Sequence, residues 1–176
     1  MTVNDFFHTG YDFPAYVEKL GDDGLKFVSR YGRIQLTPED ERFFRELKQH
    51  LNILIISESW CSDCVLNVPI IAKLAEINPQ IKVVIFPRDH YPEIMDMYLT
   101  NGKRAIPAVI MFDDNFVEVG RWIERPSVVQ KVFSEGTEAE IATMKRDYLQ
   151  GLYLEETVRE IRYVIEGIDH GQAMVG

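Results

Sequence analysis

Apolar residues gather in short, β-branched clusters in the middle of the chain. Such clusters occur at 53–57, 81–86 and 108–112, and they are typical of buried strands. The third cluster is followed by turn residues at 113–115 and by a strand pattern at 116–122, which predicts an antiparallel hairpin. A helical stretch separates the first two clusters, so these strands are expected to be parallel and the whole sheet mixed.

Helical spacing of apolar residues predicts the elements that surround this sheet. Thr37 and Pro38 are typical of a helix cap and a first helical position, and the helix that they open is expected to end near His50. The same spacing predicts further helices at 13–20, 65–77, 91–99, 127–134, 138–150 and 153–168. The segment 26–36 instead shows weak strand character. This order of elements predicts a mixed sheet with helices on both faces.

Length and charge limit the classes of protein to consider. The chain has 176 residues, 46% of them hydrophobic and 27% charged, which suits one globular domain with a buried core. We therefore expect a single domain over residues 1–176. The 28 acidic and 19 basic residues give a formal net charge of −9. An acidic surface repels phosphate backbones and anionic lipids, so neither nucleic acid nor a membrane surface is expected as a partner.

The beginning of the chain and its apolar runs bear on location. Residues 1–10 contain no Lys or Arg, so the basic region that opens a signal peptide is missing. No apolar run approaches the length needed to span a bilayer. A cytoplasmic location follows as the default expectation.

The only two cysteines, Cys61 and Cys64, are three positions apart where a predicted strand meets a predicted helix. A secreted disulfide scaffold would carry more cysteines and spread them out, whereas this spacing points to redox chemistry. At a helix N-terminus the free N–H groups and the helix dipole favour a thiolate, so the pKa of Cys61 should be lowered. Cys61 is thus the expected nucleophile, and Cys64, one turn away, the expected resolving cysteine.

Two other interpretations of the cysteine pair are weaker. A structural zinc site generally needs a second pair of ligands, and the candidate histidines are scattered and unpaired; they are His8, His50, His90 and His170. Buried, inert cysteines are less expected at an exposed junction of strand and helix. Redox chemistry is therefore preferred, with no metal and no bound cofactor, since the two sulfurs themselves carry the electrons.

Trp60-Cys61-Ser62-Asp63-Cys64, with Pro69 five residues later, resembles the Trp-Cys-x-x-Cys motif and helix-kinking proline of the thioredoxin family. Ile106-Pro107, before the third strand, is similar to the cis-proline dipeptide of that family, and Gly120 falls where thioredoxins carry a glycine. The resemblance covers roughly residues 38–135. It implies a thioredoxin-like α/β fold, with a central mixed β-sheet flanked by helices and a helical C-terminal extension over about 137–170.

The resemblance also implies roles for the residues around the cysteines. A cis Pro107 would place the backbone of Ile106 opposite the cysteines, where its N–H and C=O groups can pair with a substrate strand. The alternative is an ordinary trans proline that starts an edge strand. Trp60 is expected to shield the site and to shape the docking surface, although a tryptophan at a strand end can also serve packing alone.

The chain departs from the family pattern at several positions. Ser62 and Asp63 replace the usual Gly-Pro pair, so Ser62, Asp63 and Glu58 are the candidate tuning residues. The carboxylate of Asp63 either raises the pKa of Cys61 or acts as a helix-start acid with little effect on the sulfur. The buried aspartate of thioredoxins is Ile55 here, and Glu58 is a possible substitute whose side chain is expected to be more exposed.

These features predict a thiol–disulfide oxidoreductase that reduces disulfides of proteins or small molecules. It would be recycled by a reductase or by a low-molecular-weight thiol. Two alternatives remain: a thioredoxin-like adaptor or chaperone with minor redox activity, and a small metal site completed by a second chain. Lys103 and Arg104 precede the Ile106-Pro107 dipeptide and can either steer acidic substrates or simply form surface.

Overall fold

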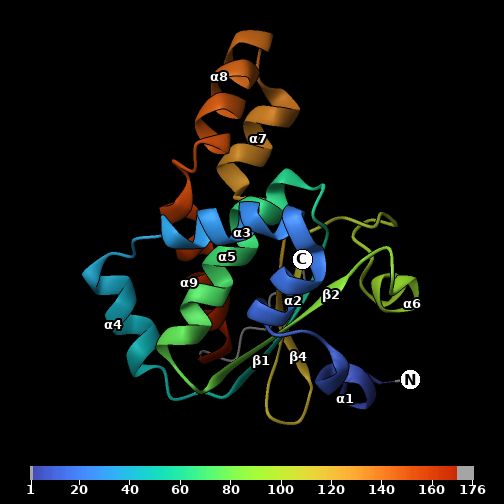
Figure 1. The fold of residues 1–176 in the computed structure, drawn as a ribbon. Coiled ribbons are helices and arrows are strands. Elements are labelled where there is room, and N and C mark those ends of the chain that lie inside the picture. The colour runs from blue at the N-terminus through green and yellow to red at the C-terminus, as the bar shows by residue number, and fades with distance from the viewer. Residues whose placement is uncertain (1, 170–176) are drawn as a thin grey trace.

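Four strands form one mixed sheet in the order β2-β1-β3-β4, as seen in the computed structural model, which describes residues 2–169 (Figure 1). Strand β1 (Leu51–Ser57) pairs in parallel with β2 (Ile81–Pro87) and antiparallel with β3 (Ala108–Phe112). Strand β4 (Glu118–Ile123) returns antiparallel to β3. The predicted mixed sheet, with its parallel pair and its hairpin, is confirmed.

The central strand β1 leads directly into the cysteine motif. All seven of its residues are buried, because it lies between β2 and β3 and under helices on both faces. The outer edge of β2 is closed by a bridge in which Tyr11 exchanges two backbone hydrogen bonds with Ile85, at 3.0 and 2.7 Å. A buried central strand fixes the position of the residues that follow it, which are those of the site.

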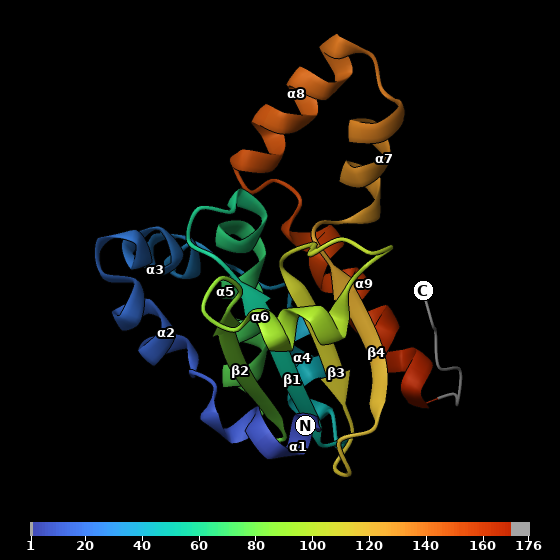
Figure 2. The same cartoon turned by 90° about the vertical axis from the view of Figure 1, so that its right-hand side faces the viewer.

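Helices cover the sheet on both faces. In Figure 2, α6 lies in front of the sheet, whereas α4, α5 and α9 lie behind it. The α-helices are α1 (Val3–Phe6), α2 (Phe13–Leu20), α3 (Gly24–Gly32), α4 (Pro38–Glu46), α5 (Ser62–Ile77), α6 (Pro92–Met95), α7 (Ser127–Glu135), α8 (Glu138–Leu149) and α9 (Leu154–Asp169). Short 3₁₀ helices occur at Phe7–Thr9, Gly21–Asp23 and Asp96–Tyr98. None of the helices within residues 2–169 combines the length and the apolar character of a membrane span.

The prediction of strand character at 26–36 is wrong, because this segment contributes to helix α3. The helix packs a single face inward: Phe27 is fully buried and meets the ring of Tyr16 edge-on at a centroid distance of 5.5 Å. Gly24 lets α3 approach the backbone of α2 closely, since a Cβ there would clash with the carbonyl oxygen of Val17. Tertiary packing against α2 therefore overrides the weak local strand signal.

Helix α4 begins as predicted but ends earlier. The hydroxyl of Thr37 caps it by accepting from the N–H of Asp40 at 3.1 Å. It ends at Glu46 instead of near His50, because the chain turns to an extended conformation at Leu47. The side chain of Asn78 donates to the carbonyls of Phe44 and Leu47, at 2.8 and 2.7 Å. It thereby gives hydrogen-bond partners to carbonyl groups that the end of the helix leaves free.

The two parts of the C-terminal helical extension differ in their packing. Helices α7 and α8 form a hairpin that projects beyond the sheet (Figures 1 and 2). Its residues Val129, Met144 and Tyr148 form a small buried cluster with Leu66 of α5, separate from the main core. Helix α9 instead returns along β4. The predicted extension reached about residue 170, and His170 lies outside the described residues.

Polar contacts anchor α9 to the sheet and to α4. The carboxylate of Glu160 accepts from the indole N–H of Trp122 at 2.7 Å and from both the backbone N–H and the hydroxyl of Ser127. Arg162 pairs with Asp40 of α4 at 2.8 Å. Helix α9 is therefore part of the cover of the sheet, and the hairpin is the element that a minimal sheet-and-helix domain lacks.

Candidate active site

The two cysteines lie at the N-terminus of α5, directly after the loop that follows β1. Cys61 is the N-cap residue, and its sulfur accepts a hydrogen bond from the backbone N–H of Cys64 at 3.4 Å. The two thiols are not joined by a disulfide. Cys61 is half-buried, whereas Cys64 is fully buried, so an incoming substrate can reach only the first sulfur.

This arrangement makes the two thiols chemically unequal. The pKa of Cys61 is lowered from its usual range, chiefly by a hydrogen bond from the Cys64 side chain and also by the backbone N–H groups of Cys64 and Asp63. Partial burial and the charge of Asp63 oppose this shift but do not reverse it. Burial raises the pKa of Cys64 well above its usual range, and the neighbouring Cys61 adds to the effect. Cys61 is therefore the better thiolate of the two.

The Ile106–Pro107 peptide bond is cis, and this segment lies beside Cys61. The carbonyl oxygen of Ile106 is 3.6 Å from the sulfur of Cys61, within the range of a thiol hydrogen bond. The carbonyl of Pro107 accepts from the N–H of Glu124 at 2.8 Å, which ties the segment to the end of β4. The backbone of Ile106 thus faces the cysteine pair in the way that the resemblance implies.

Trp60 stands on the surface next to Cys61, with 59% of its area exposed. Its indole N–H donates to a carboxylate oxygen of Asp89 at 3.3 Å, and the guanidinium of Arg88 lies over the ring, 4.6 Å from the centroid. The ring is therefore held by contacts with the loop after β2 and is not packed into the core. Core packing alone does not account for this exposed position.

Asp63 is buried and is held by two residues that the sequence did not associate with the site. One carboxylate oxygen pairs with the guanidinium of Arg125 at 2.7 Å, and the other accepts from the hydroxyl of Tyr148 at 2.7 Å. Of the two effects expected for Asp63, the charge does oppose the Cys61 thiolate, but the hydrogen bonds at the sulfur outweigh it. The carboxylate also joins the motif to the helical extension.

A buried network continues from Asp63 into α8 and α9. The side-chain amide of Asn67 donates to the hydroxyl of Tyr148 at 2.8 Å and to the carbonyl of Asp63 at 3.0 Å. The hydroxyl of Thr157 donates to the amide oxygen of Asn67 at 2.8 Å. These partners are far from Asp63 in the sequence, and no local pattern marks them, so sequence reasoning missed Arg125, Tyr148 and Thr157.

The expectation that Glu58 is more exposed is wrong. The residue is buried, because its carboxylate turns inward to accept from the backbone N–H of Asp89 at 2.7 Å. Its own backbone N–H lies near the sulfur of Cys64 and lowers the pKa of that thiol. Glu58 therefore acts on the site through its backbone, while its carboxylate secures the loop after β2. Ile55, at the position of the family's aspartate, is buried in the sheet.

A buried hydroxyl that acts on Cys64 belongs to Ser57, the last residue of β1. Its hydroxyl contributes to lowering the pKa of Cys64 and accepts a hydrogen bond from the hydroxyl of Tyr16 at 2.9 Å. Ser57 and Tyr16 are both fully buried. No sequence motif marks Ser57 or Tyr16 as part of the site, so sequence reasoning missed both.

Ser62 and the basic pair border grooves on two sides of the cysteines. Ser62, the exposed first residue of α5, lines a groove of about 270 Å³ together with Trp60 and Leu149. Lys103 and Arg104 line a second groove, which also includes the residue before Ile106. In the part of the chain that the structure describes, no three His, Cys, Asp or Glu side chains gather as a metal site would require.

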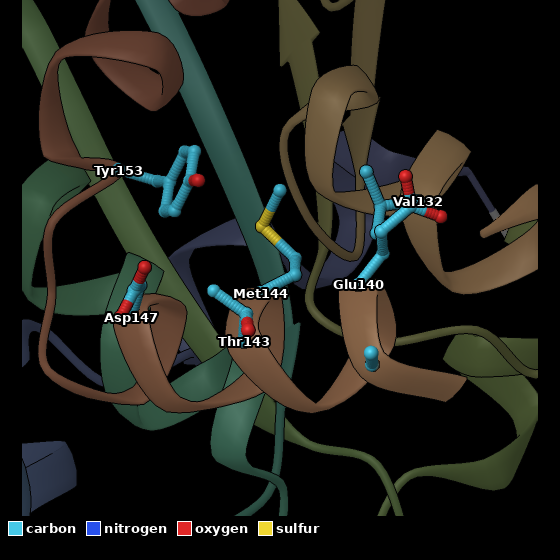
Figure 3. A pocket seen from close by; sticks show the side chains of 7 residues that line it. Val132, Glu140, Thr143, Met144, Asp147 and Tyr153 are labelled. Atoms are coloured by element: carbon cyan, nitrogen blue, oxygen red, sulfur yellow. The ribbon is translucent and has the colours of Figure 1, made fainter. Parts of the chain in front are cut away.

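A further hollow lies in the hairpin and involves neither cysteine. It has a volume of about 380 Å³ and lies between α7, α8 and the start of α9. Figure 3 shows the side chains of Thr143, Met144 and Tyr153 around it, and its surface is mostly apolar. Neither Cys61 nor Cys64 lines this hollow, so it is not part of the redox site.

Comparisons with known proteins agree with this fold. A protein of unknown function from Pseudomonas aeruginosa has a crystal structure that is 24% identical, with a TM-score of 0.78 over 95% of this chain and 98% of its own. The crystal structure of an HIV epitope scaffold is also 24% identical, with a TM-score of 0.77 over 95% of this chain and 99% of its own. No curated protein matches the sequence. A family model described as Thioredoxin matches residues 10–146, and the chain therefore belongs to a thioredoxin-like family.

Proposed function

We propose that this protein is a thiol–disulfide oxidoreductase that uses Cys61 as its nucleophile and Cys64 as its resolving cysteine. The observation that carries the proposal is the difference between the two sulfurs. Cys61 is accessible, caps a helix and has a lowered pKa, whereas Cys64 is fully buried and has a raised pKa. A reactive thiolate backed by a protected thiol is the arrangement that two-step disulfide exchange requires.

The proposed reaction transfers two electrons from the dithiol to a substrate disulfide. The Cys61 thiolate attacks one substrate sulfur, which breaks the substrate disulfide, forms a mixed disulfide and releases the first substrate thiolate. Cys64 then loses its proton and attacks Cys61, which forms the Cys61–Cys64 disulfide and releases the second substrate thiolate. The two thiolates take up protons from Cys64 and from solvent. The dithiol is oxidised and the substrate disulfide is reduced.

The Ile106 backbone and Trp60 are the proposed substrate contacts. The carbonyl of Ile106 lies 3.6 Å from the attacking sulfur, so a substrate strand that pairs with this backbone brings its disulfide to Cys61. The exposed ring of Trp60 borders the same sulfur. The substrate is a disulfide-bearing protein or small molecule, and a reductase or a low-molecular-weight thiol regenerates the dithiol.

Reduction of 2-hydroxyethyl disulfide tests the proposal directly. With dithiothreitol as the electron donor, we expect turnover by the wild-type protein and loss of turnover in Cys61→Ser. Without dithiothreitol, reduced Cys64→Ser should form a stable mixed disulfide on Cys61, detected by mass spectrometry. Equal rates for wild type and Cys61→Ser would contradict the mechanism. Equilibration against glutathione buffers then gives the reduction potential of the pair and hence the direction of electron flow.

An adaptor function is the alternative, and the hairpin with its apolar hollow is the observation in its favour. The same assay distinguishes the two functions. An adaptor would form the Cys61–Cys64 disulfide when oxidised but would reduce substrates no faster than Cys61→Ser.

A further inference from the structure

A polar groove that contains an unpaired lysine adjoins the segment that faces the cysteines. It has a volume of about 540 Å³, and its walls come from the loop before β3 and from the end of β4 with the start of α7. The lining residues that matter for its chemistry are Lys103, Arg104, Ala105, Glu124, Arg125 and Gln130. None of these residues has a part in the exchange steps themselves.

The groove lies next to the backbone segment that faces Cys61. Ala105 directly precedes Ile106, whose carbonyl oxygen is 3.6 Å from the sulfur of Cys61. On the opposite wall, Glu124 is bonded through its N–H to the carbonyl of Pro107. A substrate whose sulfur reaches Cys61 alongside Ile106 therefore extends its neighbouring atoms into this groove.

Lys103 is the cation of the groove that has no acidic partner among residues 2–169. The groove is lined by three cations and one acid. Arg104 binds Asp96 with two hydrogen bonds of 2.8 Å, and Arg125 lies 2.7 Å from Asp63 and 4.0 Å from Glu124. Lys103 is exposed and forms no ion pair within the described residues. An unpaired ammonium group on the groove attracts anions to it.

We propose that this groove binds a carboxylate of the substrate close to its disulfide, with Lys103 as the main cationic contact. The proposal rests on the proposed oxidoreductase function and names the class of substrate: disulfides that carry a negative charge within a few bonds of the sulfur. The amide of Gln130 can donate a further hydrogen bond to such a group.

Three small disulfides that differ mainly in charge test this specificity. We measure how fast the reduced protein is oxidised by each of 3,3′-dithiodipropionate, 2-hydroxyethyl disulfide and cystamine. Each rate is divided by the rate at which the same disulfide oxidises free dithiothreitol, which corrects for the intrinsic reactivity of the disulfide. We expect the anionic disulfide to be preferred over the neutral one, and the preference to fall as salt is added. A Glu-flanked peptide disulfide, compared with its Gln-flanked equivalent, shows whether polypeptides as well as small molecules supply the carboxylate.

The variant Lys103→Glu should lower the normalised rate with the anionic disulfide roughly three- to tenfold, the effect of one or two surface charge contacts. The rate with the neutral disulfide should change much less than the rate with the anionic one, and the rate with cystamine should rise. Lys48→Glu is the matched control, because it makes the same change of net charge at an exposed site before β1, at the opposite end of the sheet. An equal effect of both variants would assign the preference to overall charge and overturn the proposal.

A binding measurement separates this inference from the proposed activity. S-methylglutathione carries two carboxylates but no exchangeable sulfur, and its addition should shift the amide resonances of residues 100–105 in wild type and much less in Lys103→Glu. Shifts without any disulfide reduction would leave the anion groove in place and reject the oxidoreductase. Reduction with no charge preference and no shifts would reject the groove and leave the oxidoreductase.

Discussion

The reactivity expected of each sulfur follows from where one helix begins. Cys61 caps α5, so N–H groups and the Cys64 side chain point at its sulfur and stabilise the thiolate. Cys64, three residues on, is already inside the protein, where charge is unfavourable. One turn of helix thus separates an anion-stabilising position from an anion-excluding one. No additional general base is needed to explain why the first sulfur reacts first.

The lowered pKa of Cys61 predicts the pH dependence of its alkylation. The iodoacetamide rate should rise with pH through a midpoint below that of a peptide cysteine, about 8.5. Cys64→Ser replaces the main hydrogen-bond donor to the Cys61 sulfur by a different one, so its midpoint should move from the wild-type value. Mass spectrometry should find the first label on Cys61. First labelling on Cys64 would contradict the assignment of roles.

The Ser57 hydroxyl predicts how fast the mixed disulfide resolves. Because this hydroxyl lowers the pKa of Cys64, Ser57→Ala should raise that pKa further and leave less Cys64 thiolate for the second step. The Cys61 mixed disulfide should therefore last several times longer, as followed by quenched-flow mass spectrometry. Ser59→Ala is the control, since that hydroxyl bonds to Asp23 at 3.3 Å. Equal lifetimes in both variants would remove Ser57 from the mechanism.

At the scale of elements, the sequence predicted those parts that local patterns determine. The β-branched runs located β1, β2 and β3, the strand pattern after the turn located β4, and Thr37-Pro38 located the start of α4. The patterns failed where a distant residue decides the outcome. Gly24–Gly32 is a helix because Phe27 packs under Tyr16, and the early end of α4 is stabilised because the side chain of Asn78 donates hydrogen bonds to the carbonyls of Phe44 and Leu47. Neither partner is visible from the segment itself.

The residues of the candidate site also differ in whether the sequence could reveal them. Trp60, Cys61 and Cys64 come from one stretch of chain, and Ile106-Pro107 was found through the family resemblance, so sequence reasoning could place them together. Arg125 reaches Asp63 from the segment after β4, and Tyr148 reaches it because the hairpin folds back over α5. A tyrosine at helical spacing in a late helix carries no sign of a partner 85 residues away.

The network around Asp63 predicts separable effects on stability and on the thiol. Asp63→Asn removes a charge that raises the pKa of Cys61, so that pKa should fall further. It also removes the closer of the two carboxylates that pair with the partly buried Arg125, which should lower the free energy of unfolding by about 3 kcal/mol. Alkylation rates and urea unfolding measure the two effects.

Tyr148→Phe serves as the matched variant for this element. It keeps the charge of Asp63 but removes the hydroxyl that Asp63 and Asn67 share, which should cost about 1–3 kcal/mol of stability. The pKa of Cys61 should stay close to that of wild type. A shift as large as that of Asp63→Asn would mean that the hairpin acts on the sulfur by moving it and not through the charge of Asp63.

At the scale of the whole molecule, one part of the helical extension packs against the sheet and the other part projects beyond it. Helix α9 buries Val158, Ile161 and Ile165 against the sheet, whereas the hairpin has its own small cluster with Tyr148 as a polar link to the site. The extension therefore has two roles in the architecture: α9 completes the domain, and the hairpin forms one side of the surroundings of the cysteines. Removal of α9 should expose the sheet, while changes in the hairpin should reach the site through Asp63.

The close approach of α9 to β4 predicts the outcome of a substitution at Gly120. A Cβ there would clash with Cγ1 of Val164, and the stiff, β-branched Val164 has little freedom to move aside. Gly120→Ala should therefore lower the free energy of unfolding by about 1–3 kcal/mol in urea. Gly32→Ala, with open space around its Cβ, should change it by less than about 1 kcal/mol. In the double variant, Val164→Ala should recover part of the unfolding free energy that Gly120→Ala loses. If the two losses of unfolding free energy were strictly additive, the clash would not lie between α9 and β4, and the packing of α9 on this strand would be contradicted.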